Sequence, residues 1–136
     1  MIKSYFVFTC LAAFFFLFSI DASAQKKQRV VLKKRVTKVT GIIQGEQIRE
    51  YVFRVRKNTD IDISVVHNYF EEPVKPHPKF VVFLPGGKPL HEDQEPGTDL
   101  LEVLEIAGDY TVRLQLPEDM RNDGKPVKFT LQFTVK

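Results

Sequence analysis

The sequence predicts an all-β protein that folds as a single antiparallel β-sandwich of about seven to eight short strands, preceded by a cleaved signal peptide. Three observations support this prediction. Apolar and polar residues alternate with a period of two in several segments, turn residues separate these segments, and none of them shows the 3.6-residue period of a helix. Short strands spaced by turns are typical of β-sandwiches.

The first 24 residues have the features of a secretory signal. Lys3 is followed by a nearly unbroken apolar run over residues 5–20, and Ala22-Ser23-Ala24 offers the small residues that a signal peptidase recognises. The run is shorter than the roughly 20 residues that a membrane-spanning helix needs. We therefore expect residues 1–24 to be a signal peptide and residues 25–136 to form one β-sandwich domain without a transmembrane segment.

Cysteine use and charge narrow the class of protein. The single cysteine, Cys10, lies in the apolar run, so the exported chain has no disulfide. An exported chain that also lacks an Asn-x-Ser/Thr acceptor fits a periplasmic or secreted bacterial protein. The net charge of +3 is too small to indicate a nucleic-acid-binding protein.

Basic residues are concentrated near the start of the domain. This cluster indicates either a solvated edge strand or a surface for an anionic glycan or another anionic part of the cell envelope. Its members are Lys26, Lys27, Arg29, Lys33, Lys34, Arg35 and Lys38.

The expected strands follow one another from residue 30 onwards. In the first, Gly41 indicates a bulge or a close approach of another part of the chain. In the second, Tyr51, Phe53 and Val55 alternate with polar residues and form the face that we expect to be buried. Prolines interrupt the pattern over residues 67–78, which we expect to be a loop. The expected strands are residues 30–43, 49–56, 61–65, 80–84, 100–106, 108–116 and 128–136.

The last two segments show the most regular alternation. We interpret them as a hairpin closed by a polar loop that contains residues 121–125, and we place the candidate functional site in this loop. The apolar faces consist of Tyr110, Val112, Leu114 and Leu116 in one strand and of Phe129, Leu131, Phe133 and Val135 in the other.

No catalytic or metal-binding motif is found in the sequence. Ser64 is the only serine after residue 24 and lies in the middle of an expected strand, where no nucleophile elbow is possible. The three histidines are isolated from one another, and the acidic residues of 118–123 do not have the spacing of a calcium loop. We therefore expect the protein not to be an enzyme and to use no metal or other cofactor.

Four segments together resemble the bacterial periplasmic inhibitors of g-type lysozyme. The first runs from Thr40 to Glu46 and contains Gly-Ile-Ile-Gln-Gly, and the second is the strand around Tyr51. The others are Gly-Asp-Tyr-Thr-Val-Arg at residues 108–113 and Arg-Asn-Asp-Gly-Lys at residues 121–125. The chain also resembles the wider pre-peptidase C-terminal-like β-sandwich, which shares the Gly-x-Ile-x-Gly and Gly-Asp-Tyr patterns.

The resemblance implies a protein that inserts loops into the substrate cleft of a g-type lysozyme. In that family, two arginines and a tyrosine after the Gly-x-Ile-x-Gly turn are implicated. The first arginine matches Arg121, which Asn122 follows, and the second falls on Lys125, which keeps the charge but lacks the planar fork of arginine. Glu46 occupies the tyrosine position. The other interpretation is a non-catalytic sandwich that binds a cell-envelope glycan or an anionic surface.

Overall fold

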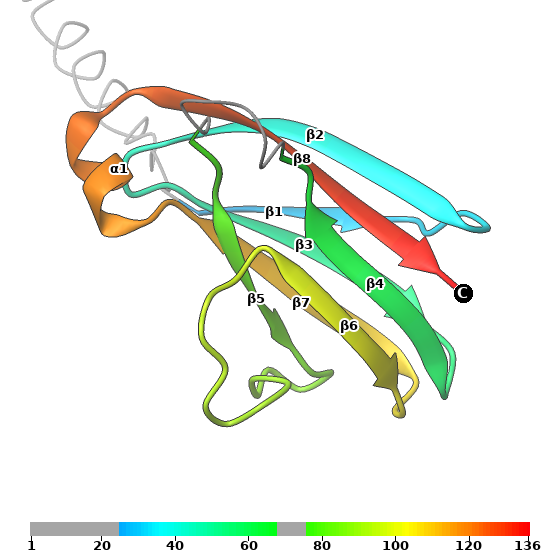
Figure 1. Cartoon of the computed structure of the whole chain (residues 1–136). Coiled ribbons are helices and arrows are strands. Elements are labelled where there is room, and N and C mark those ends of the chain that lie inside the picture. Colours follow the sequence, from blue (N-terminus) through cyan, green and yellow to red (C-terminus); the bar gives the residue numbers. More distant parts are fainter. Residues whose placement is uncertain (1–24, 68–75) are drawn as a thin grey trace, which may run out of the picture.

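The computed structural model describes residues 25–67 and 76–136, which form two four-stranded β-sheets packed face to face (Figure 1). One sheet has the order β1-β3-β7-β5 and the other has the order β2-β8-β4-β6. The predicted all-β sandwich is therefore confirmed. The described elements are β1 (Gln25–Val30), β2 (Val36–Gln44), β3 (Ile48–Val55), β4 (Thr59–Val65), β5 (Lys79–Phe83), β6 (Asp99–Leu104), β7 (Gly108–Gln115), α1 (Glu118–Asp123) and β8 (Pro126–Val135).

The predicted signal peptide at residues 1–24 and most of the proline-rich segment lie outside the described residues. Within the described part of the chain, no helix has the length and apolar character required to cross a membrane.

The N-terminal strand pairs in a way that the sequence did not predict. One strand was expected over residues 30–43, but the chain leaves the first sheet after β1, and Arg35 adopts a φ of 71° just before β2 begins in the second sheet. The chain reverses between β1 and β2 and again between β2 and β3. As a result β1 runs parallel to β3, with Val30 opposite Phe53.

The predicted hairpin of the last two strands is wrong. β7 lies between β3 and β5 in one sheet, whereas β8 lies between β2 and β4 in the other. The segment that joins them contains α1 and crosses the end of the sandwich (Figure 1). Alternation defines which face of a strand is buried, but it does not define which strand lies beside it.

An aromatic cluster joins the two sheets. Phe53 of β3 and Tyr110 of β7 stack with their ring centroids 5.8 Å apart, and Phe133 of β8 meets Phe53 across the sandwich at 5.1 Å. All three residues are fully buried. The Tyr110 hydroxyl donates a hydrogen bond to the carbonyl of Ile106 at 2.8 Å, so its polar end is satisfied. The predicted inward faces of these strands are confirmed.

Gly41 lies in β2 where an aromatic side chain approaches the backbone. It pairs with Phe129 of β8, and the register is continuous from Val36 to Gln44, so the glycine marks a close approach and not a bulge. A Cβ atom at this position would lie 2.7 Å from Cζ of Phe129 and 3.3 Å from the hydroxyl of Tyr51. Glycine is therefore required for the packing of these two rings, whose centroids are 6.3 Å apart.

We expect Gly41→Ala to lower the free energy of unfolding by about 1–3 kcal/mol, because the added methyl group forces the buried Phe129 ring to move. Urea denaturation at neutral pH measures this change. The matched control is Gly87→Ala. That glycine has open space around it, so any loss there comes only from its positive φ of 97°. If Gly41→Ala leaves the stability unchanged, the close approach is not rigid.

Two arginines of the first sheet contact the same carboxylate, and one of them links the edge strand β1 to β7. Arg29 of β1 and Arg54 of β3 both contact the carboxylate of Asp109 on β7, at 2.9 Å and 3.1 Å. The hydrogen bond from Arg29 is the main cause of the lowered pKa of Asp109, and burial opposes it. The same hydrogen bond raises the pKa of Arg29. The side chain of Arg29 thus reaches across β3 and connects β1 to β7.

The lowered pKa of Asp109 predicts a contribution to stability that depends on pH. The carboxylate is stabilised in the folded state, so its contribution is present above the ordinary pKa of 3.8 and is lost as the pH falls through the lowered value. We expect Asp109→Asn to be less stable than the parent protein at neutral pH and to approach the stability of the parent protein in acid. Urea denaturation across this pH range measures the difference, and a constant difference at all pH values would contradict the ion pair.

Candidate partner-binding site

The turn between β2 and β3 lies beside the connection from α1 to β8. Gln44 at the end of β2 pairs with Pro126 at the start of β8. The Gln44 side chain also donates a hydrogen bond from Nε2 to the carbonyl of Gly124. The antiparallel pairing of β2 with β8 therefore brings the turn that contains Glu46 next to the segment that contains Lys125. We call this end of the sandwich the α1 end (Figure 1).

α1 is a single short helix with defined boundaries. It begins after Pro117, whose carbonyl accepts hydrogen bonds from the backbone N–H groups of Met120 and Arg121, both at 3.0 Å. It ends at Gly124, which has the left-handed φ of 68° that favours glycine at this position. The following N–H, from Lys125, donates to Oδ1 of Asp123 at 2.8 Å. These contacts fix the conformation of the segment that we expected to be a loop.

The structure brings the four predicted site residues to one end of the molecule. Glu46 lies in the β2–β3 turn, Asn122 lies in α1, Lys125 follows it, and all three side chains are exposed. Arg121 lies in the last turn of α1 and is half-buried. Among the described residues, none of the four forms an ion pair. Both basic side chains can therefore bind an anionic group of a partner.

Arg121 borders a cavity of about 460 Å³ beside α1. Its buried Nε atom has no hydrogen-bond partner in the part of the chain that the structure describes. Lys79 of β5 and Glu95 also border this cavity, so two cations and one carboxylate surround it. Its lining is completed by Pro96, Gln115, Leu116 and Pro117.

Sequence reasoning missed Lys79 because no local pattern places it near α1. It reaches the α1 end through the pairing of β5 with β7, in which Lys79 lies opposite Gln115. This pairing joins segments that are distant in sequence, so only the tertiary structure reveals it.

Arg49 adds a further cation at the same end. Its Nη2 atom donates to the carbonyl of Ile42 at 3.2 Å and to Oε1 of Gln47 at 3.0 Å, which orients the guanidinium beside the β2–β3 turn. Arg49 borders a cavity of about 360 Å³ at the edge of the sandwich, together with Tyr51 and Gln28. Burial raises the pKa of Tyr51, and the charge of Arg49 partly offsets this effect. The phenol thus remains a hydrogen-bond donor at neutral pH.

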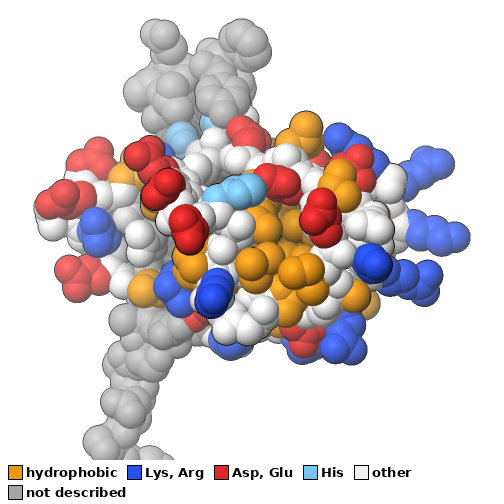
Figure 2. All heavy atoms as spheres, turned by 90° about the horizontal axis from the view of Figure 1, so that it is seen from below, with side chains coloured by type: hydrophobic (Ala, Val, Ile, Leu, Met, Phe, Trp, Pro, Cys, Tyr) orange, Lys and Arg blue, Asp and Glu red, His pale blue; other side chains and the backbone are white. Residues whose placement is uncertain are grey.

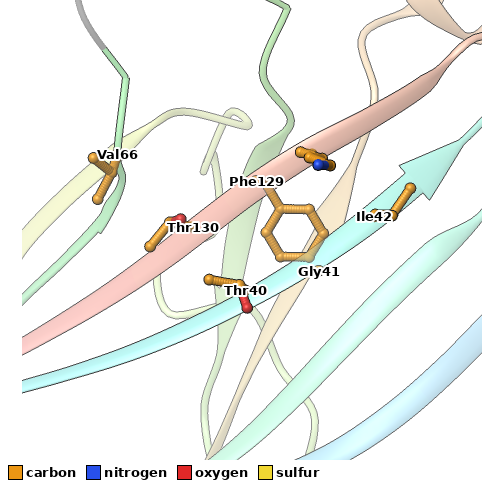
Figure 3. A pocket seen from close by; sticks show the side chains of 7 residues that line it. Thr40, Gly41, Ile42, Val66, Phe129 and Thr130 are labelled. Atoms are coloured by element: carbon orange, nitrogen blue, oxygen red, sulfur yellow. The ribbon is translucent and has the colours of Figure 1, made fainter.

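A third hollow lies over β2 and β8 (Figure 3). Its volume is about 540 Å³, and Figure 3 shows Thr40 and Thr130 from the two paired strands with Val66 to one side. Ile42 and Lys128 line its other part. It offers hydroxyl groups, apolar surface and one cation. Within the described ranges, no group of three or more metal-ligating side chains lies close enough together to hold a metal ion.

The structure thus defines a β-sandwich that presents polar loops at one end, together with the basic side chains of Arg49, Lys79, Arg121 and Lys125, an arrangement suited to binding. The same fold occurs in the crystal structure of PliG, a periplasmic inhibitor of g-type lysozyme from Aeromonas hydrophila. That chain is 14% identical, with a TM-score of 0.62, and the match covers 82% of this chain and 99% of that one. The inhibitor from Salmonella Typhimurium is 16% identical, with a TM-score of 0.55 and coverages of 80% and 99%.

The pre-peptidase C-terminal domain of a Bacillus anthracis collagenase also has this fold. It is 17% identical, with a TM-score of 0.54, and the match covers 82% of this chain and 96% of that domain. No protein-family model and no curated protein sequence matches the chain. The predicted fold group, which comprises the inhibitors and the pre-peptidase domains, is confirmed by these structures.

Proposed function

We propose that the chain is an exported bacterial protein that inhibits a g-type lysozyme by placing its α1 end in the substrate cleft. The observation that carries this proposal is the pairing of Gln44 with Pro126, which positions the Glu46 turn beside the segment from Arg121 to Lys125. The fold shared with periplasmic inhibitors of g-type lysozyme supports it. In this proposal the protein is periplasmic or secreted, and it is not an enzyme.

The chemistry of such a cleft favours a guanidinium group. Glycoside-cleaving sites contain carboxyl groups, one of them an acid with a raised pKa. Arg121 forms no ion pair with a described residue, so the outer N–H groups of its guanidinium can donate paired hydrogen bonds to such a carboxylate. Lys125 then adds a second positive charge at the rim, and the Asn122 amide adds neutral donors and an acceptor.

Glu46 differs from Arg121 and Lys125 because it brings a negative charge to the proposed contact. Its exposed carboxylate lies in the turn next to Lys125 and would face the carboxylates of the cleft with the same charge. Like charges repel, so Glu46 is better placed at the rim, against basic or amide groups of the partner, than in the centre of the contact.

A turbidity assay tests the proposal directly. The chain that starts at Gln25 contains every described element. We expect it to slow the digestion of bacterial cell walls by a g-type lysozyme at micromolar concentration. A c-type lysozyme acting on the same walls is the control for specificity. If the folded protein at micromolar excess does not slow the g-type enzyme, the proposal is wrong.

A further inference from the structure

The end of the sandwich opposite α1 carries a cluster of basic side chains. Three parts of the chain meet there, namely the β1–β2 connection, the β3–β4 turn and the C-terminus. The backbone N–H of Val135 donates to the carbonyl of Arg35 at 2.8 Å, and the N–H of Lys136 donates to the carbonyl of Asp60 at 3.0 Å. We call this region the basic end. Its exposed basic residues are Lys33, Lys34, Arg35, Arg56, Lys57 and Lys136.

Few opposite charges neutralise this cluster. None of the six basic residues forms an ion pair with another described residue, and the exposed acidic groups nearby are Asp60, Glu105 and the C-terminal carboxylate of Lys136. Figure 2 shows lysine and arginine side chains projecting together at the right-hand end of the molecule. A notch of about 530 Å³ at this end is bordered by Arg54, Arg56 and Lys57. Such a surface attracts a partner with many negative charges.

An exposed apolar side chain lies within the basic end. Val31 follows β1 directly and is 77% exposed, whereas the next residue, Leu32, packs against the core. Leu32 therefore anchors the connection while Val31 projects from it beside Lys33 and Lys34. Val36, at the start of β2, adds a second apolar side chain that is 42% exposed.

We propose that the basic end docks on a bilayer surface that contains anionic phospholipid, with Val31 entering the headgroup region. Basic residues around an apolar group are the combination that favours an anionic bilayer, because lipid provides both negative phosphates and an apolar interior. A soluble polyanion would use the cations but would offer nothing to Val31. Such docking would be independent of lysozyme inhibition. Because the basic end and the α1 end lie at opposite ends of the strands, a docked molecule would present α1 away from the bilayer (Figure 1).

Vesicle co-sedimentation tests the proposal. We expect the chain that starts at Gln25 to bind phosphatidylcholine vesicles containing phosphatidylglycerol, but not vesicles of phosphatidylcholine alone. Each basic residue near an anionic bilayer contributes about fivefold to binding. The triple variant Lys33→Gln, Lys34→Gln, Lys57→Gln should therefore bind roughly 100-fold more weakly. Raising the salt concentration from 0.1 M to 1 M shortens the Debye length from about 10 Å to about 3 Å. This should weaken the binding of the parent protein to the vesicles by a similar factor.

The matched control removes the same charge from the α1 end and from Lys128, which lies near the start of β8. The triple variant Lys79→Gln, Lys125→Gln, Lys128→Gln should retain vesicle binding. The basic-end triple variant should instead retain any effect that the parent protein has on lysozyme digestion. Val31→Ser should weaken vesicle binding and leave binding to soluble polyphosphate unchanged. Circular dichroism and urea denaturation establish that each variant is folded.

Three results would overturn the proposal. The first is equal weakening by the two triple variants, since the basic end would then have no special role. The second is equal binding to vesicles with and without phosphatidylglycerol. The third combines two observations, namely that Val31→Ser binds vesicles as tightly as the parent protein does and that soluble polyphosphate competes fully with the vesicles. Together they would identify the surface as a site for soluble polyanions.

Discussion

Replacing Phe53 with alanine is expected to lower the free energy of unfolding by about 3–5 kcal/mol. Phe53 is fully buried and contacts Tyr110 in its own sheet and Phe133 in the facing sheet, with ring centroids 5.8 Å and 5.1 Å away. Removing the ring leaves a cavity between the sheets and eliminates both aromatic contacts. Because domains of this size have total stabilities of about 5–15 kcal/mol, the variant loses a large part of its stability.

Urea denaturation at neutral pH measures this loss. Phe53→Leu is the matched control and should lose less, because leucine keeps part of the apolar volume between the two sheets. Arg54→Ala, in the adjacent exposed position of β3, should have a much smaller effect, since exposed ion pairs contribute little. A loss below about 1 kcal/mol for Phe53→Ala would mean that this aromatic cluster does not join the sheets.

The buried faces of the strands are encoded locally in the sequence, whereas the pairing of the strands is not. The period-two pattern is a property of consecutive residues, so it correctly identified the buried faces of β3, β7 and β8. The pairing of these strands depends on contacts between distant segments. For this reason the alternation of β7 and β8 suggested a hairpin, although the two strands belong to different sheets.

The same limit applies to the start of the domain and to α1. The expected strand over residues 30–43 joined the end of β1 to β2, because the change of sheet between Val30 and Val36 occurs without a glycine or a proline. α1 has only six residues, which is less than two helical turns, so no helical period could be recognised in it. Its boundaries are set by Pro117 and Gly124, which the sequence also allows in a loop.

The candidate site was predictable only where segments carry a recognisable pattern. The resemblance pointed to Glu46 and to residues 121–125, and the structure places these at the same end of the sandwich. Lys79 and Arg49 carry no such pattern, since their proximity to α1 results from the pairing of β5 with β7 and from the hydrogen bonds at the β2–β3 turn. The proposed contact surface is thus more basic than the predicted four residues alone.

This additional charge affects how a substitution in α1 should be interpreted. Lys79 and Arg49 would still attract the carboxylates of a cleft if Arg121 were removed, so an effect on long-range attraction should be small. The loss expected from Arg121 comes from short-range hydrogen bonds in the bound state. It should therefore appear mainly as faster dissociation of the complex, with a nearly unchanged rate of association.

Arg121→Ala is expected to weaken the inhibition of a g-type lysozyme by about 2–5 kcal/mol, which corresponds to roughly 30-fold to 5,000-fold in the inhibition constant. The reason is that truncation leaves a carboxylate of the cleft buried without its partner. Arg121→Lys should recover only part of the affinity, because lysine keeps the charge but cannot form two parallel hydrogen bonds. The inhibition constant in the cell-wall assay measures each effect.

Arg56→Ala is the matched control, because it removes the same type of side chain from the opposite end of the sandwich and should leave inhibition unchanged. Arg121 borders a cavity and is half-buried, so the stability of its variants must be measured in parallel. A folded Arg121→Ala protein with the potency of the parent would show that α1 does not enter the cleft. Equal losses from Arg121→Ala and Arg56→Ala would show instead that overall charge, and not the geometry of the α1 end, determines binding.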